Sequence, residues 1–260
     1  MNITEKMKQN REFMKSPSFF ENMTKSDQHL GLPQPPVEKA ATGEVIQLPC
    51  FDNVITNGAY TDLLDVRRSV RLYTDKAATQ QQLAFMLWSV QGVQFFRDET
   101  RYASMRPVPS GGARHPFEAY VAVMNVDGLK SGIYHYLPLE HIGEKRVAIE
   151  FLHDIDEATP GQAVVDALAG QKWAKTSAFV LFFTCLAYRA EWRYHEMSHR
   201  VALIDLGHVG QNAMLSAAAM GLGSCCCAAF DTEVSNKMLR VDGTDEFMVY
   251  GVTVGTPKKQ

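Results

Sequence analysis

A series of strand-like segments without regularly spaced helices restricts the fold more than any other feature of this sequence. Residues 118–124 are mostly apolar, residues 132–137 alternate, and residues 147–152 and 176–186 are two further strand candidates. The last of these contains residues 179–183 (FVLFF), a continuous apolar run that is typical of a central strand. Because strands and helices do not alternate regularly along the chain, the pattern favours an α+β fold over a doubly wound sheet.

Helical patterns flank these strands. Residues 79–93 carry an apolar face, and residues 199–220 are apolar nearly all round and rich in glycine and alanine. The second pattern predicts a long helix that is buried on several sides. Small residues allow another backbone to approach closely, so this helix is a candidate for a contact between two subunits. Shorter helices are expected at 61–68 and 231–239, and strands at 225–228 and 247–254.

Composition excludes several classes of protein. The chain has 260 residues and is 46% hydrophobic, which is enough to build one large domain or two small ones. Its formal net charge is −3. No basic stripe indicates a nucleic-acid face, and no apolar run approaches the roughly 20 residues of a membrane helix. The N-terminus lacks the apolar segment of a signal peptide. The five cysteines include three neighbours and no C-x-x-C, which favours a reducing, cytoplasmic setting.

Residues 1–59 differ in character from the rest. They are rich in Lys, Glu and Asn at the start, and the run Leu32-Pro33-Gln34-Pro35-Pro36 interrupts any helix. We interpret this region as an N-terminal arm that is partly helical and wraps the body of the protein, with disorder as the alternative. The body is expected to be a single domain over residues 60–260.

The stretch Arg67-Arg68-Ser69-Val70-Arg71 is the most informative motif. It places three guanidinium groups and a hydroxyl within five residues of an acidic chain. Guanidinium matches phosphate and carboxylate groups in bidentate geometry, so the cluster indicates a discrete anion site. The alternative is a solvated helix end with loose surface pairs.

Three other segments have both a functional and a structural interpretation. The turn at residues 109–116 (PSGGARHP) exposes backbone N–H groups and admits a ligand, or is simply a loop. Residues 225–227 (CCC) could bind metal, act in redox chemistry or pack, and a strand cannot point three neighbours one way, so packing is favoured for at least two. The tail Lys258-Lys259 is solvated or supplies a second cation to the same anion.

The spelling His195-Glu196-Met197-Ser198-His199 matches the H-E-x-x-H motif of zinc hydrolases. We argue against that function. Residue 202 is Ala where the extended motif has Gly, no suitable third ligand follows, and the arginines at 193 and 200 lie beside the would-be cation site. A short motif of this kind also occurs by chance.

Taken in order, several blocks of the sequence resemble the nitroreductase superfamily of FMN flavoproteins, and within it the SagB-type (azoline-type) dehydrogenase branch. The resemblance covers about residues 60–260 and leaves the arm outside. The blocks are Arg67–Arg71, Pro109–Tyr120, Gly132–Tyr136, Trp192-Arg193-Tyr194 with Arg200 and Asp205–His208, Gly221-Leu222-Gly223, Phe230-Asp231 and Val254-Gly255.

The resemblance implies a fold and a set of site residues. The fold would be a mainly antiparallel sheet flanked by helices, with the long helix at a homodimer interface and FMN bound between the subunits. Pro109, Ser110 and Gly111 would reach the flavin from the other subunit, and an N–H near Ala228 would approach the hydride-accepting N5 atom. Cofactor contacts are implied for Arg67, Arg68, Ser69, Arg71, Lys258, Cys226, Cys227, Ala228 and Ala229.

One departure from the branch concerns the proposed catalytic pair Arg193 and Tyr194. Branch members carry a Lys-Tyr pair that is implicated in oxidation, and here the lysine is replaced by Arg193. Arginine is always protonated and cannot serve as a base, whereas Tyr194 can still exchange a proton. The replacement weakens azoline oxidation as the function and leaves simple flavin redox chemistry unaffected.

The leading hypothesis is therefore an FMN-dependent oxidoreductase with ping-pong hydride transfer at N5, using NAD(P)H to reduce nitro- or quinone-type acceptors. One alternative is a SagB-type dehydrogenase that oxidises a peptide azoline or small heterocycle with O2 as acceptor. Another is a non-catalytic flavin-binding protein whose arm docks a partner. The expected partners are a second copy of the chain and a small-molecule substrate, with neither nucleic acid nor membrane.

Overall fold

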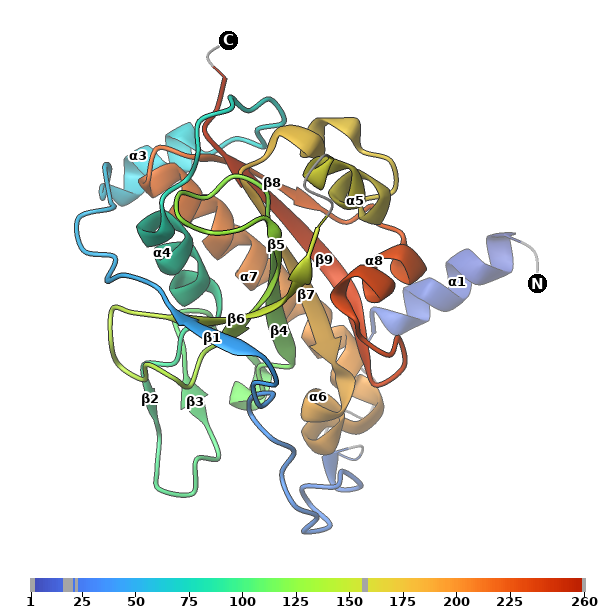
Figure 1. Ribbon diagram of the computed structural model, residues 1–260. Helices are drawn as coiled ribbons and strands as arrows, with labels where there is room; N and C mark the ends of the chain where they lie inside the picture. Colours follow the sequence, from blue (N-terminus) through green and yellow to red (C-terminus); the bar gives the residue numbers. More distant parts are fainter. Residues whose placement is uncertain (1–2, 16–20, 22, 156–158, 259–260) are drawn as a thin grey trace.

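The computed structural model describes residues 3–15, 21, 23–155 and 159–258. Its centre is a seven-stranded sheet in the order β1-β6-β5-β4-β7-β9-β8, in which every neighbouring pair is antiparallel (Figure 1). The antiparallel sheet confirms the predicted α+β class. The strands are β1 (Glu44–Gln47), β4 (Phe117–Val123), β5 (Gly132–Leu137), β6 (Ala148–Asp154), β7 (Phe179–Leu186), β8 (Gly223–Cys227) and β9 (Glu246–Gly255), and a separate hairpin joins β2 (Phe95–Phe96) to β3 (Ser104–Met105).

Helices cover both faces of this sheet (Figure 1). On one face α4 (Gln80–Gln91) and α7 (Ser198–Ala219) pack together, and on the other lie α5 (Pro160–Ala167) and α8 (Thr232–Leu239). The capping box between Thr79 and Gln82 explains where α4 begins. Three further α-helices are α1 (Ile3–Phe13), α3 (Tyr60–Val66) and α6 (Ala187–Tyr194).

Strand β7 shows why the apolar run at 179–183 is continuous. Phe179, Leu181 and Phe183 pack towards α4 and α7, whereas Val180 and Phe182 pack towards α5 and α8. All five side chains are fully buried. Side chains alternate across a strand, so a strand with a core on each face must be apolar at every position. The prediction of a central strand is confirmed.

The long helix α7 is also confirmed, but one of its sides is not buried in the single chain. Leu203 and Ile204 are 55% and 52% exposed, although both are large and apolar. Gly207 lies on the same side, where an added Cβ would meet no atom within 4 Å. The exposed side is formed by Leu203, Ile204, Gly207, His208 and Gln211.

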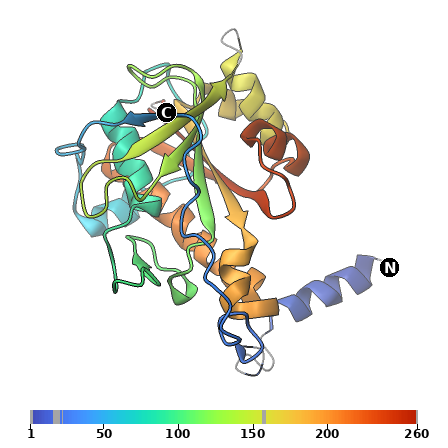
Figure 2. The same cartoon turned by 60° about the horizontal axis from the view of Figure 1, so that its bottom comes forward.

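The N-terminal arm follows the surface of the body, and Figure 2 shows its blue trace running from α6 to the edge of the sheet. Lys39 binds the buried carboxylate of Glu246 at 2.6 Å and the hydroxyl of Tyr120 at 2.7 Å. Further along, residues 44–47 form β1, which pairs with β6. Part of the arm therefore completes the main sheet. By contrast, α1 contains no buried residue.

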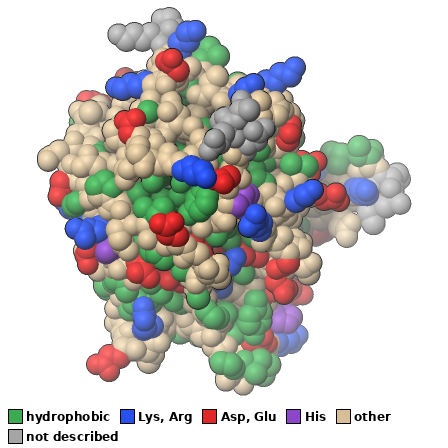
Figure 3. Space-filling model, in the orientation of Figure 1, with side chains coloured by type: hydrophobic (Ala, Val, Ile, Leu, Met, Phe, Trp, Pro, Cys, Tyr) green, Lys and Arg blue, Asp and Glu red, His purple; other side chains and the backbone are tan. Residues whose placement is uncertain are grey.

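The surface shows no region dominated by one charge on the face in Figure 3, where acidic and basic side chains are interspersed. Within the described residues, no helix is both long enough and apolar enough to cross a bilayer.

Candidate cofactor site

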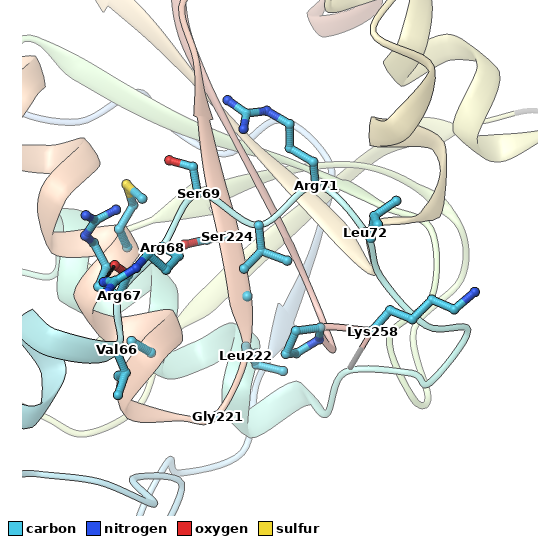
Figure 4. A pocket seen from close by; sticks show the side chains of 15 residues that line it. Val66, Arg67, Arg68, Ser69, Arg71, Leu72, Gly221, Leu222, Ser224 and Lys258 are labelled. Atoms are coloured by element: carbon cyan, nitrogen blue, oxygen red, sulfur yellow. Dashed lines mark hydrogen bonds between the residues drawn. The ribbon is translucent and has the colours of Figure 1, made fainter. Parts of the chain in front are cut away.

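A cavity of about 560 Å³ lies beside the segment that follows α3 (Figure 4). Its size falls within the roughly 300–1,000 Å³ that is usual for small-molecule sites. Four parts of the chain meet there, and they are far apart in the sequence. They are residues 66–72, the end of α7 at Met214 and Ala218, the turn Gly221–Ser224, and the tail at Pro257 and Lys258.

Backbone hydrogen bonds hold the arginine-rich segment in an extended form. The N–H of Val70 donates to the carbonyl of Ser224 at 2.9 Å, and the N–H of Lys258 donates to the carbonyl of Leu72, also at 2.9 Å. The segment is thereby fixed between β8 and the C-terminal tail. Gly223 makes the close approach possible, because a Cβ at this position would lie 2.8 Å from the Cβ of Val70.

Four cationic side chains line this cavity. In Figure 4, Arg67 and Arg68 lie on the left of the cavity, Arg71 lies at the top and Lys258 lies on the right. No Asp or Glu is among the lining residues, and in the described part of the chain none of the four forms an ion pair. The cavity therefore favours an anionic ligand.

Ser224 provides an independent sign of a ligand. Its side chain is 2% exposed, and its Oγ atom is buried without a hydrogen-bond partner among the described residues. A buried hydroxyl without a partner costs about 1–3 kcal/mol, and a ligand oxygen in the cavity would remove this cost. The residues present thus fit a phosphate-bearing cofactor.

The predicted cofactor residues fall into two groups. Arg67, Arg68, Ser69, Arg71 and Lys258 all line the cavity. The segment 226–229 does not line it but continues from Ser224 along β8 and beyond. Sequence reasoning missed Ser224, Met214 and Ala218. The neighbouring Gly-Leu-Gly turn is one of the family blocks, but nothing in the sequence distinguishes Ser224 as a hydroxyl that lacks a partner among the described residues.

The three neighbouring thiols behave as alternation predicts. Cys225 and Cys227 are 1% and 3% exposed, and the half-buried Cys226 has its Sγ 3.6 Å from the carbonyl of Gly210. A hydrogen bond from the Cys227 thiol, together with the charge of Arg71, outweighs burial and lowers the pKa of Cys225 to about 7. The same pairing raises the pKa of Cys227 above its usual range.

Arg193, Tyr194 and the Pro109–Gly111 loop form a second cluster, away from the cavity. Tyr194 is 8% exposed, and its ring lies against Gly111, where an added Cβ would be 3.3 Å from Cε2. Gly112 has a φ of +57°, and a Cβ there would lie 2.4 Å from Nε of Arg193, so only glycine fits this close approach. The structure therefore brings the catalytic candidates and the loop together.

Asp205 fixes the loop to α7. Its carboxylate accepts hydrogen bonds from the hydroxyl of Ser110 at 2.7 Å and the N–H of Gly111 at 2.9 Å. Burial raises the pKa of Asp205, and these two hydrogen bonds offset part of the rise. Because a helix rises about 1.5 Å per residue, Asp205 and the cavity-lining Ala218 lie about 20 Å apart along α7. One chain thus does not place both clusters against one small ligand.

The H-E-x-x-H spelling does not lie on one helix. Residues His195–Met197 form a 3₁₀ turn, His195 has a φ of +50°, and α7 begins only at Ser198. The nitrogen Nε2 of His199 instead lies 2.8 Å from the carboxylate of Glu191. The single helical face that the zinc motif requires is absent, and no group of three potential metal ligands gathers within the described residues.

Comparison with known proteins places this geometry in a family. Residues 64–256 match the sequence model of the family described as "Nitroreductase family". The chain is 30% identical over 196 residues to "Putative nitroreductase MJ1384" of Methanocaldococcus jannaschii, covering 75% of this chain and 89% of that protein. It is 28% identical over 143 residues to the microcin B17-processing protein McbC of Escherichia coli, covering 53% of this chain and 49% of McbC.

A solved structure agrees in fold. The crystal structure of a "putative nitroreductase" from Ralstonia eutropha superposes with a TM-score of 0.64 at 22% identity. The superposition covers 88% of this chain and all of that one. The match over most of the body, together with the relative from M. jannaschii, shows that this chain belongs to the nitroreductase family.

Proposed function

We propose that this protein is an FMN-dependent oxidoreductase that uses NAD(P)H to reduce nitro- or quinone-type acceptors. The observation that carries the proposal is a cavity whose described lining has four cations and no carboxylate, in a member of the nitroreductase family. FMN carries a phosphate at one end, which is the group that such a cavity accommodates.

In this proposal Arg67, Arg68 and Lys258 hold the phosphate, and Ser69 and Ser224 donate hydrogen bonds to other oxygens of the cofactor. Arg71 lies further along the same extended segment, within reach of a polar ring edge. The backbone of residues 226–229 extends the same wall and would lie against the ring. When bound, FMN supplies the two-electron exchange between donor and acceptor.

The active site is proposed to need a second copy of the chain. The exposed side of α7 presents Leu203 and Ile204 beside Gly207, which is a surface suited to close helix packing. Pairing two α7 helices in opposite directions would place the Ser110 loop and Tyr194 of one copy near the cavity of the other. Tyr194 would then contact the acceptor and could transfer a proton to it, while Arg193 is held by Gln28 and Tyr102.

One relative favours a second candidate function. McbC is named as a processing protein for microcin B17, which supports a SagB-type dehydrogenase acting on a peptide azoline or heterocycle with O2. Arg193 weighs against this reaction, because a guanidinium does not take up a proton at neutral pH. The chain also spans only about half of McbC.

The decisive experiment is the visible spectrum of the purified protein, before and after FMN is added, followed by anaerobic addition of NADH or NADPH. A yellow protein that NAD(P)H bleaches and that a nitroarene or quinone restores supports the proposal. A protein that stays colourless with added FMN refutes it. If NAD(P)H does not reduce the bound flavin but a peptide heterocycle does, the result favours the dehydrogenase. If only dithionite reduces the flavin, the result favours a non-catalytic flavin-binding protein.

A further inference from the structure

A second cationic cluster lies where the arm meets α6, and flavin binding does not account for it. Its centre is Arg193. The Nη1 atom of Arg193 donates to Oε1 of Gln28 at 2.7 Å and to the hydroxyl of Tyr102 at 2.5 Å, and both acceptors are uncharged. The Nε atom is buried and has no hydrogen-bond partner among the described residues.

Arg114 adds a second guanidinium to this cluster. It is 5% exposed, and its guanidinium carbon lies 4.4 Å from the ring centroid of Tyr102 and 5.2 Å from that of Trp192. Its hydrogen bonds go to the carbonyls of Gly112 and Tyr102. Burial lowers the pKa of Arg114, and the nearby charge of Arg193 lowers it further. Neither guanidinium forms an ion pair within the described part of the chain.

A cavity of about 560 Å³ opens onto Arg193 from the arm. Its other lining residues are polar or sulfur-containing, and the described lining includes no acid: they are Met23, Thr24, Ser26, Gln28 and His29. Three acidic residues of this region face elsewhere. Asp27 accepts a hydrogen bond from Tyr188 at 2.7 Å and, with Glu191 and Glu196, lines a separate cavity.

Within the described residues, carboxylates line one cavity beside α6, and the guanidinium of Arg193, which forms no ion pair there, lines the other. Partly buried positive charge is costly unless an anion compensates it. Gln28 and Tyr102 both accept from Nη1 of Arg193, and neither carries the charge that would compensate the guanidinium, which leaves an oxyanion in the cavity to do so.

We propose that Arg193 and arm residues 23–29 form a binding site for an oxyanion, either a carboxylate or a phosphate group, that is separate from the flavin cavity. The bound anion supplies the negative charge that compensates the guanidinium of Arg193. Gln28 is the positioning residue, because its amide connects Arg193 to Tyr102 through one hydrogen bond to each.

The test is calorimetric titration of FMN-loaded protein with inorganic phosphate and, separately, with succinate. Loading with FMN keeps phosphate out of the first cavity. We expect Arg193→Gln to weaken binding of the preferred anion by about tenfold or more, as loss of a charge-assisted hydrogen bond does. The matched control is Arg97→Gln, which removes an exposed arginine outside both cavities and should leave the affinity unchanged.

A second variant keeps the proposal falsifiable if Arg193→Gln fails to fold. Gln28→Glu places a carboxylate against Nη1, so it should abolish anion binding and raise the melting temperature measured without added anion. Binding of phosphate alone or succinate alone identifies the type of oxyanion. Equal binding by wild type and Arg193→Gln, binding of neither anion, or an unchanged Gln28→Glu overturns the proposal.

The outcome is independent of the proposed flavin chemistry. If the protein does not take up FMN, the same titrations are made in an Arg67→Gln background, which weakens the first cavity as a competing anion site. Loss of anion binding on changing Arg193 then still supports the second site, although the proposed function has failed.

Discussion

Asp205 accepts hydrogen bonds from both the hydroxyl of Ser110 and the N–H of Gly111, and so ties the glycine-rich loop to the N-terminal half of α7. The cavity with Arg67 lies at the opposite end of the same helix. The residues expected to surround one flavin are thus divided between the two ends of one rigid element. This division is the reason why we propose that two chains build each active site.

Arg67→Gln should weaken FMN binding by about 10- to 100-fold, because a hydrogen bond to a charged group contributes about 1.5–3 kcal/mol. Quenching of flavin fluorescence on titration with protein measures the affinity. Arg97→Gln, an exposed arginine outside the cavity, is the matched control. If the two variants bind FMN equally well, Arg67 does not hold the cofactor.

Ile204→Glu should convert the proposed dimer to a monomer and weaken FMN binding, because it places a charge on the apolar side of α7. Sedimentation velocity gives the oligomeric state, and the flavin spectrum gives the occupancy. Val234→Glu on α8, which changes another exposed apolar helix residue, should alter neither. A monomeric wild type that holds FMN in full would contradict the proposed two-chain site.

Cys225 should titrate with a midpoint near its pKa of about 7, and Cys227→Ala should move that midpoint up, because it removes the thiol that stabilises the Cys225 thiolate. The pH dependence of Cys225 alkylation by iodoacetamide, followed by peptide mass spectrometry, measures this shift. Cys226→Ala is the control, since Cys226 lies on the other side of β8. An unchanged midpoint in Cys227→Ala would show that the two thiols are not coupled.

Acid should destabilise the fold through Glu118. Burial raises the pKa of this carboxyl, but Arg189 at 2.6 Å and His135 at 2.9 Å more than reverse the effect and bring it to about 2. A depressed native pKa stabilises the fold above the ordinary value of 4.5, and this stabilisation is lost as the pH falls towards 2. The loss is about 3 kcal/mol, and urea unfolding across this pH range measures it.

Glu118→Gln tests the same assignment. It should make the free energy of unfolding less dependent on pH below 4.5, while lowering it by about 3–5 kcal/mol at neutral pH because Arg189 stays buried without its partner. Glu99→Gln, at an exposed carboxylate, should change neither quantity. A variant with the full wild-type pH dependence would mean that another group is responsible.

The main sheet and its helices could be predicted because the spacing of apolar residues along the chain indicates which side chains are buried. The apolar run of β7 follows from a core on each face, and the glycine- and alanine-rich segment 199–220 forms one long helix. The arginine cluster pointed to an anion site from five neighbouring residues, but that stretch alone left a solvated helix end as the alternative. Strand β1 was missed because it is short and half exposed, and it exists through pairing with β6.

Tertiary structure alone decided which of these residues meet. Folding brings Lys258 and Ser224 to the cavity that Arg67 lines, through backbone hydrogen bonds to Leu72 and from Val70, and among the described residues it leaves the hydroxyl of Ser224 without a partner. It also separates Arg193 from Arg67 by the length of α7 and places the arm residue Gln28 on it. Sequence determines the chemistry and local shape of each segment, whereas long-range packing decides which charges are compensated and which stay open to a ligand.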